Sequence, residues 1–189
     1  MNYLNIRRRF RSPTLKYVAL FIASLLSFQA NASDFDALVD CYLEAVDKHD
    51  FELVVELLHP DELAKFKQTI DATLNGPNKR LAEAELLPLL GVNSPQQAAK
   101  LTAKSSYINF SNNLVARYPA EMQQITAASS TYLRESQQGD VVSVQYQMHY
   151  QFAAQNFSRV VEHRFKQFDG QWRILMTPET FAYLNRYLH

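Results

Sequence analysis

The stretch VVSVQYQMHYQF at residues 141–152 decides how this chain folds, because apolar and polar side chains alternate along it. A period of two is typical of a β-strand that buries one face and leaves the other in water. The apolar face comprises Val142, Val144, Tyr146, Met148, Tyr150 and Phe152. The polar face comprises Ser143, Gln145, Gln147, His149 and Gln151. The alternation therefore predicts a long antiparallel strand.

Turn signals on both sides of this strand predict the rest of a sheet. Gly139-Asp140 lies before it, and Asp169-Gly170 further on is a strong hairpin signal. The segments that these turns join are predicted to be strands at Thr131–Gln137, Phe157–Phe168 and Gln171–Met176. Thr177-Pro178-Glu179 is a helix start, so we expect a short helix after the last strand.

Before Pro119 the apolar residues recur at intervals of three and four, which predicts helices instead of strands. Asp50 is positioned to cap one of them, and Ser94-Pro95-Gln96-Gln97 is a capping box for another. Gly76-Pro77 and Gly91 end two more. We therefore expect an α+β fold in which N-terminal helices pack on a four-stranded antiparallel sheet and a short helix closes the chain.

Two segments carry a resemblance to a known family. Residues 42–51, YLEAVDKHDF, continue to Leu57-Leu58-His59-Pro60-Asp61, and residues 168–174 read FDGQWRI. Both resemble the nuclear-transport-factor-2-like superfamily, which includes ketosteroid-isomerase-like and SnoaL-like proteins. The resemblance implies a curved sheet that wraps the N-terminal helices into a cone with an internal cavity. The stretch from Asn78 to Ala120 is longer and more helical than the family pattern.

The first 32 residues have the order of a secretory signal peptide. A basic segment with Arg7, Arg8, Arg9, Arg11 and Lys16 precedes a 12-residue apolar run at 17–28, and Ala30-Asn31-Ala32 is a cleavage signal. The run is shorter than the roughly 20 residues of a membrane span. We expect a signal peptide at 1–32, a single domain at 33–189, and a secreted or periplasmic protein without a stable membrane anchor.

The leader leaves the route of export open. Arg7-Arg8-Arg9-Phe10 fits part of a twin-arginine signal, although Arg11 replaces the apolar residue that this signal prefers. General secretion is therefore the favoured route.

The charge and the cysteine content argue against a nucleic-acid-binding protein and against a fold held by an internal disulfide. Without the five leader cations, 14 basic side chains face 19 acidic ones, so the mature chain carries a net charge of −5. Such a chain repels phosphate backbones, and we expect no nucleic-acid partner. Cys41 is the only cysteine, so the fold rests on packing and not on an internal disulfide.

Three residues are candidates for catalysis: His163, Tyr146 and Asp40. His163 shares a strand face with Val161 and Phe165, so it points toward the core, where it can act as an acid or base or can simply bond a backbone carbonyl. A ketosteroid-isomerase-type reaction, which the resemblance implies, needs a carboxylate base and Tyr donors. Asp36, Asp40 or Asp47 on the first helix could supply the base, although a solvated helix face also explains them.

A pocket and an interface are the other expected sites. The pocket residues are Tyr42, Tyr146, Tyr150, His163 and Trp172. The interface residues are Gln145, Gln147, His149 and Gln151, an uncharged row that suits a homodimer through the sheet face. We expect no metal site and no cofactor, because the five histidines show no ligand spacing.

These observations favour a noncatalytic module that binds an apolar small molecule or another protein. Two alternatives stay open. One is a small-molecule isomerase or hydrolase that uses a pocket His or Asp with Tyr donors. The other is a structural dimerisation domain.

Overall fold

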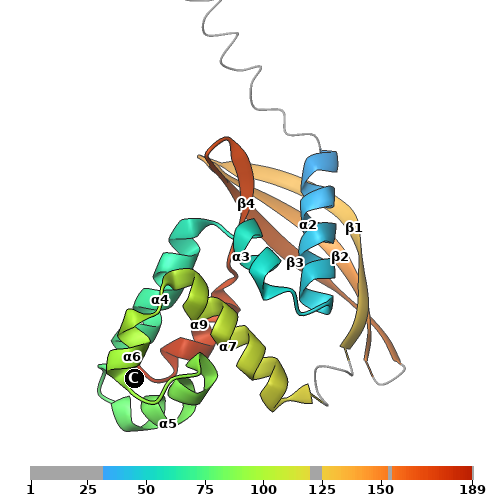
Figure 1. Cartoon of the computed structure of the whole chain (residues 1–189). Coiled ribbons are helices and arrows are strands. Elements are labelled where there is room, and N and C mark those ends of the chain that lie inside the picture. Colours follow the sequence, from blue (N-terminus) through green and yellow to red (C-terminus); the bar gives the residue numbers. More distant parts are fainter. Residues whose placement is uncertain (1–31, 120–124, 153–154, 189) are drawn as a thin grey trace, which may run out of the picture.

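The computed structural model describes residues 32–119, 125–152 and 155–188, and the expected signal peptide lies outside them except for Ala32. Helices come first, then a four-stranded antiparallel sheet, then a short helix (Figure 1). The helices before the sheet are α2 (Ala32–Asp47), α3 (Phe51–Leu57), α4 (Pro60–Leu74), α5 (Lys79–Leu90), α6 (Pro95–Lys100) and α7 (Ala103–Arg117). They are followed by β1 (Ile125–Gln138), β2 (Val141–Phe152), β3 (Gln155–Phe168), β4 (Gln171–Leu175) and α9 (Pro178–Asn185). The predicted α+β class is confirmed.

The sheet is a meander in which each strand pairs with the next, in the order β1-β2-β3-β4. The predicted turns join the strands, and Gly139, Asp169 and Gly170 have φ angles of 62°, 50° and 75°. These left-handed values are what tight hairpin turns require. β1 begins at Ile125, six residues before its predicted start, because it pairs with β2 as far as Phe152. The side chains in this first part of β1 are mostly small or polar, so they show no alternation in the sequence.

The two faces of β2 differ as the alternation predicted. Val142, Val144, Tyr146 and Met148 are buried, whereas Gln145 and Gln147 are half-buried and His149 is exposed. The side chains of Tyr150, Gln151 and Phe152 lie outside the described part. The register of the sheet therefore aims Tyr146 into the core.

The helix starts confirm the capping signals. The Asp50 carboxylate accepts a hydrogen bond from the Leu53 amide at 3.0 Å. In the capping box, Ser94 Oγ accepts from the Gln97 amide at 3.3 Å, and the Gln97 side chain accepts from the Asn93 amide at 2.8 Å. His59 is buried and its Nδ1 accepts from the Asp61 amide at 3.2 Å, so it caps the start of α4.

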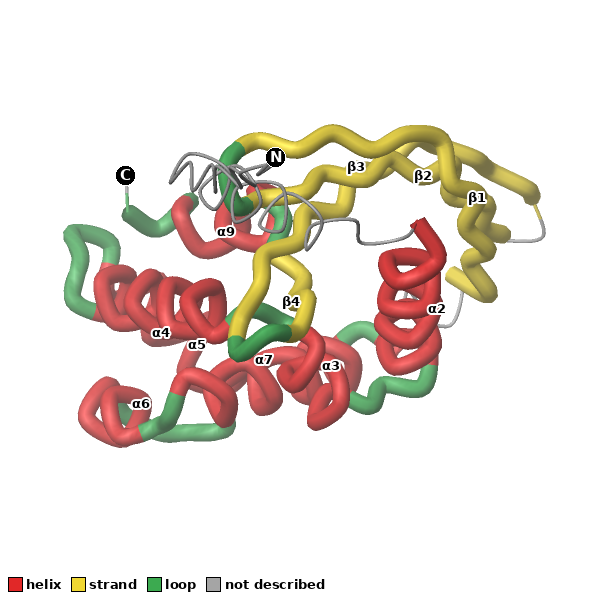
Figure 2. The backbone as a smooth tube through the Cα atoms, turned by 90° about the horizontal axis from the view of Figure 1, so that it is seen from above, coloured by secondary structure: helices red, strands yellow, loops and turns green. Residues whose placement is uncertain are grey.

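Apart from α3, which contacts both α2 and α7, the helices divide into two groups. α2 lies along one face of the sheet next to β1, whereas α4, α5, α6, α7 and α9 pack on one another beside the sheet (Figures 1 and 2). We call the latter five the helical group. The long stretch between Asn78 and Ala120 forms α5, α6 and α7, which pack on α4.

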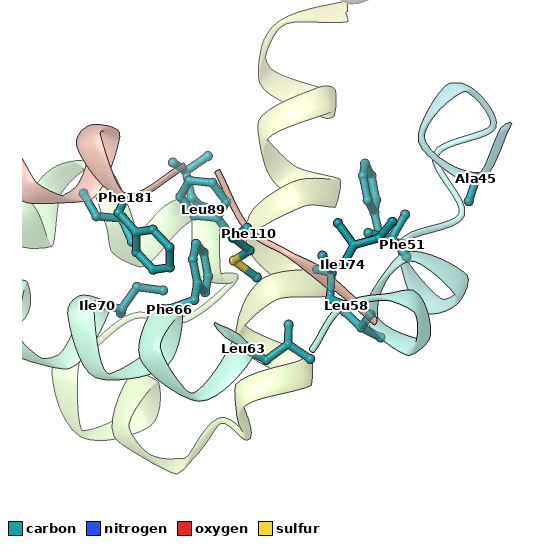
Figure 3. Packing of buried hydrophobic residues seen from close by; sticks show 14 of the residues in the cluster. Ala45, Phe51, Leu58, Leu63, Phe66, Ile70, Leu89, Phe110, Ile174 and Phe181 are labelled. Atoms are coloured by element: carbon teal, nitrogen blue, oxygen red, sulfur yellow. The ribbon is translucent and has the colours of Figure 1, made fainter. Parts of the chain in front are cut away.

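One core joins the two groups. Figure 3 shows Phe66, Ile70, Phe110 and Phe181 together inside the helical group, and Phe51, Leu58 and Ile174 together at the junction with β4. At that junction the amide of His59 donates to the carbonyl of Ile174 at 2.9 Å. On the sheet face, Phe35 of α2 packs against Phe165 of β3 with ring centroids 4.6 Å apart. The buried residues of both groups thus form one hydrophobic cluster.

Candidate functional site

A group of polar side chains lies between α2 and the sheet. Tyr146 of β2 is fully buried, and His163 of β3 is 8% exposed. The two are diagonal neighbours on the inner face, because His163 pairs with Val144 and Tyr146 pairs with Val161. Their ring centroids are 5.8 Å apart, and Asp36 of α2 lies beside the Tyr146 hydroxyl. We call these three residues the Asp36–Tyr146–His163 cluster.

Aromatic rings surround this cluster on two sides. The ring of Tyr42, six residues along α2 from Asp36, meets His163 edge-on at 6.3 Å. The ring of Tyr132 on β1 lies directly across from Tyr146 and meets it edge-on at 6.2 Å. One tyrosine ring from α2 and one from β1 therefore pack against the cluster.

Each member of the cluster has a buried polar atom without a hydrogen-bond partner among the described residues. These atoms are Asp36 Oδ1, Tyr146 Oη and His163 Nε2. Asp36 lies close enough to the Tyr146 hydroxyl for its charge and a weak hydrogen bond to raise the pKa of the phenol, although the contact does not reach the geometry of a normal hydrogen bond. An unsatisfied buried polar group costs about 1–3 kcal/mol, so three in one place call for an explanation.

The electrostatics keep the two sheet residues uncharged near neutral pH. Burial raises the pKa of the Tyr146 phenol, and the neighbouring carboxylates of Asp36 and Asp40 raise it further. Burial lowers the pKa of His163 below its ordinary value. Burial likewise raises the pKa of Tyr42. The cluster thus presents a neutral phenol that can donate and a neutral imidazole that can donate or accept.

Asp40, the expected carboxylate, lies at the rim of this cluster. Its side chain is exposed, and its Oδ1 accepts a hydrogen bond from the Ser130 hydroxyl of β1 at 3.3 Å. Asp36, one turn earlier on the same helix, has the buried oxygen beside Tyr146. The interpretation of Asp36 as part of a fully solvated face is wrong, because Asp36 lies next to the apolar stripe of α2, on the side of the helix that faces β1.

The other expected pocket residues do not all join the cluster. Tyr42, Tyr146 and His163 come together, but the Trp172 ring packs on Phe35 at 5.2 Å near the β3–β4 hairpin. There Trp172 lines an open pocket of about 320 Å³ with Lys166 and Asp140, which form an ion pair at 3.0 Å. The Tyr150 side chain lies outside the described part, so its place in the pocket stays a prediction.

The row of amides on the outer sheet face has hydrogen-bond partners within the chain. Arg134 of β1 donates to Gln145 Oε1 at 2.8 Å, and Gln145 donates to Glu162 of β3 at 3.4 Å. Ser143 also donates to Glu162, at 3.3 Å. Charged side chains on β1 and β3 therefore form hydrogen bonds with part of the uncharged row on β2. The interface itself stays a prediction.

The comparisons with known proteins add no family to these observations. No protein-family model matches the chain, and no match is found among curated proteins. Within residues 32–119, 125–152 and 155–188, no helix is both long and apolar enough to cross a membrane. The same part of the chain contains no group of three His, Cys, Asp or Glu side chains arranged for a metal ion.

Sequence reasoning named Asp36 only as one of three possible bases, and it did not place Tyr132 or Ser130 beside the cluster. Asp36 and Asp40 are four residues apart, so they share one flank of α2, and this spacing was the available signal. Nothing in the sequence shows which strand that flank faces. Tyr132 is found only through the β1–β2 register, in which it pairs with Tyr146.

Proposed function

We propose that this chain is an exported, noncatalytic binding module that holds the polar end of a small, largely apolar molecule at the Asp36–Tyr146–His163 cluster. The observation that carries the proposal is the set of three buried polar atoms on α2, β2 and β3 that have no hydrogen-bond partner among the described residues. A ligand that pairs with them removes a cost of folding, because each unpaired group is destabilising. A cone formed by the sheet around α2, as in the nuclear-transport-factor-2-like superfamily, belongs to this proposal.

The chemistry of the site favours a neutral ligand with one polar end. Tyr146 and His163 are uncharged near neutral pH, so an oxygen acceptor such as a carbonyl matches the phenol. The rings of Tyr42 and Tyr132, which pack against His163 and Tyr146, add apolar surface next to the cluster. The carboxylates of Asp36 and Asp40 disfavour an anion at this position.

Binding of the neutral fluorescent ketone prodan tests the proposal. Its carbonyl accepts a hydrogen bond, and its naphthalene ring fits aromatic walls. Tyr146→Phe removes one hydrogen bond worth about 1 kcal/mol, so we expect roughly five- to tenfold weaker binding. The unfolding free energy changes little, since the hydroxyl makes no hydrogen bond of normal geometry with the described residues. Tyr118→Phe, at the exposed end of α7, is the matched control and leaves the affinity unchanged.

Two results contradict the binding proposal. One is the absence of saturable prodan binding. The other is binding that neither Tyr146→Phe nor His163→Gln weakens, because the cluster would then lie outside the binding site.

An enzyme is the second candidate function, favoured by the carboxylate of Asp36 next to a phenol and an imidazole. That set suits proton transfer beside a carbonyl group, with the carboxylate as base and Tyr146 as donor to the forming oxyanion. Mass spectrometry of prodan after incubation in D₂O distinguishes the two. The binding proposal predicts no deuterium at the CH₂ next to the carbonyl above the buffer rate. Uptake that Asp36→Asn abolishes assigns an enzyme instead.

Export is the cellular part of the proposal and rests on the leader sequence. Residues 1–31 lie outside the described part, so the structure does not bear on it. N-terminal sequencing of the protein from its native host should begin at Ser33 or a near neighbour. A cytosolic pool that keeps Met1 contradicts export.

A further inference from the structure

An open pocket of about 390 Å³ lies where α4, α9 and β3 meet. We call it the α4–α9 pocket. Its lining includes Lys65 and Thr69 of α4, Arg164 of β3, Met176 after β4, and Phe181 and Asn185 of α9. Arg164 follows His163 on β3, and successive side chains of a strand point to opposite faces. The pocket is therefore separate from the Asp36–Tyr146–His163 cluster.

Two cations from distant parts of the chain share this pocket. Lys65 comes from α4 and Arg164 from β3, and no Asp or Glu lines the pocket with them. Among the described residues, neither cation takes part in a salt bridge. Because like charges at one place repel each other, the arrangement is stabilised when an anion enters between them.

Neutral groups hold both cations in place. Lys65 Nζ lies 4.3 Å from the centroid of the Phe181 ring, and Arg164 Nη2 donates to the carbonyl of Met176 at 3.4 Å. A ring and a carbonyl orient these groups without cancelling their charge. An ammonium has three donors and a guanidinium five, so both keep donors for a ligand.

The acids nearest in sequence do not neutralise the pocket. Glu162 accepts hydrogen bonds from two side chains of β2. Hydrogen bonds from its own backbone and from Thr177 lower the pKa of Glu179, and the cation that acts on it is Arg159. Glu62, one turn before Lys65 on α4, does not line the pocket and forms no salt bridge among the described residues.

We infer that the α4–α9 pocket binds a small organic molecule through a carboxylate or phosphate group. Lys65 and Arg164 donate charge-assisted hydrogen bonds to the oxyanion, and the planar guanidinium fits two of its oxygens. Asn185 adds an amide donor, and Met176 and Phe181 offer apolar surface to the organic part. This inference does not rest on the function proposed for the Asp36–Tyr146–His163 cluster.

Isothermal titration calorimetry at low ionic strength tests the inference with phenyl phosphate, benzoate and the neutral control benzyl alcohol. We expect saturable binding of at least one anion, whose identity tells phosphate from carboxylate, and at least tenfold weaker binding of the alcohol. Lys65→Gln and, separately, Arg164→Gln should weaken the anion at least roughly fivefold, because each removes a charged donor. Lys100→Gln on α6 and Arg80→Gln on α5 remove the same charges at exposed positions and should leave the affinity unchanged.

Amide chemical shifts locate the contact. On titration with the bound anion, the amides of residues 65–69, 164 and 176–185 should shift, whereas those of α2 should not. Lys65 is exposed, so Lys65→Gln decides the outcome even if Arg164→Gln unfolds the chain. Three results overturn the inference. They are no saturable binding of either anion, equal binding of benzyl alcohol, and an affinity that the Lys65 and Lys100 variants lower equally, which means attraction to the net charge alone.

Discussion

The helical group and the α2–sheet region bury polar side chains in different ways. In the helical group, Asn109 and Asn113 of α7 donate to the carbonyls of Leu90 and Leu89 at 3.0 Å each, and so complete the end of α5. The Thr73 hydroxyl donates to the carbonyl of Thr69 at 2.7 Å. In the α2–sheet region, three neighbouring side chains each keep a buried polar atom without a described partner.

This difference indicates where the chain gives up stability for another role. Ser106 Oγ and Glu62 Oε2 in the helical group also lack partners, but they lie on different helices, α7 and α4. Among the described residues, the α2–sheet region is where such atoms gather next to two aromatic rings. Unsatisfied buried groups in native proteins call for an explanation, and the proposed ligand would supply one here.

The largest expected effect is on the helical group. Phe66 of α4 is 1% exposed and meets the rings of Tyr107 and Phe110 at 5.3 and 5.5 Å. Phe66→Ala should lower the unfolding free energy by about 3–5 kcal/mol, measured by urea denaturation, because it leaves a cavity in a packed core. Leu81→Ala, at a side chain that is 54% exposed, should cost far less.

The same variant tests whether the two regions are one cooperative unit. Far-ultraviolet circular dichroism reports mainly on the helices, and the fluorescence of Trp172, the single tryptophan, reports on β4. Because one core joins the regions, both signals should shift together in Phe66→Ala. Separate transitions would make the helical group an independent unit.

The next effect concerns the inner sheet face. Tyr146→Ala should cost on the order of 3 kcal/mol, since the ring is fully buried. We expect a smaller loss than for Phe66→Ala, because the substitution also removes an unpaired hydroxyl. Paired urea titrations of the two variants measure the difference. A larger loss for Tyr146→Ala would mean that its hydroxyl is satisfied in the folded protein.

The strands and helices could largely be predicted from the sequence, because their signals are local. Alternation placed β2, the Asp169-Gly170 turn placed the last hairpin, and the capping box placed α6. The separation of the helical group from the sheet could not be predicted. It depends on α5 and α7 packing against α4 instead of the sheet. Periodicity shows that a helix has an apolar face, but not which apolar surface that face covers.

The candidate site was predictable only in part. Tyr146 and His163 lie on predicted strand faces, and the strand register brings them together. Asp36 joins them through the rotation of α2 about its own axis, which is set by Phe35 and Val39 packing against the sheet. Which of two carboxylates one turn apart is buried is a tertiary property and has no local signal.

The pH dependence of the unfolding free energy tests whether His163 is a buried, neutral side chain in the α2–sheet region. Burial lowers its pKa in the folded chain, whereas the unfolded chain titrates near 6.5. Below pH 6.5 the unfolded state therefore binds a proton that the folded state resists, and stability falls by up to about 1.4 kcal/mol per pH unit. Urea denaturation between pH 7.5 and 5 should show a flatter profile for His163→Gln than for the parent. His149→Gln, at an exposed position, should follow the parent, and equal slopes for all three would contradict a buried neutral imidazole.

The smallest effect is expected on the outer sheet face. Gln147 is half-buried and points away from α2, so Gln147→Ala should change the unfolding free energy by less than about 0.5 kcal/mol.

A second substitution at Gln147 tests the homodimer that we expect through this face. Across a two-fold contact, Gln147→Glu places two carboxylates near each other, so it should shift a dimer toward monomer in light scattering at micromolar concentration. Gln137→Glu, exposed near the turn between β1 and β2, serves as the control. A parent that is monomeric at every concentration contradicts the dimer, and the hydrogen bonds of Arg134 and Glu162 to Gln145 then account for that part of the row within a single chain.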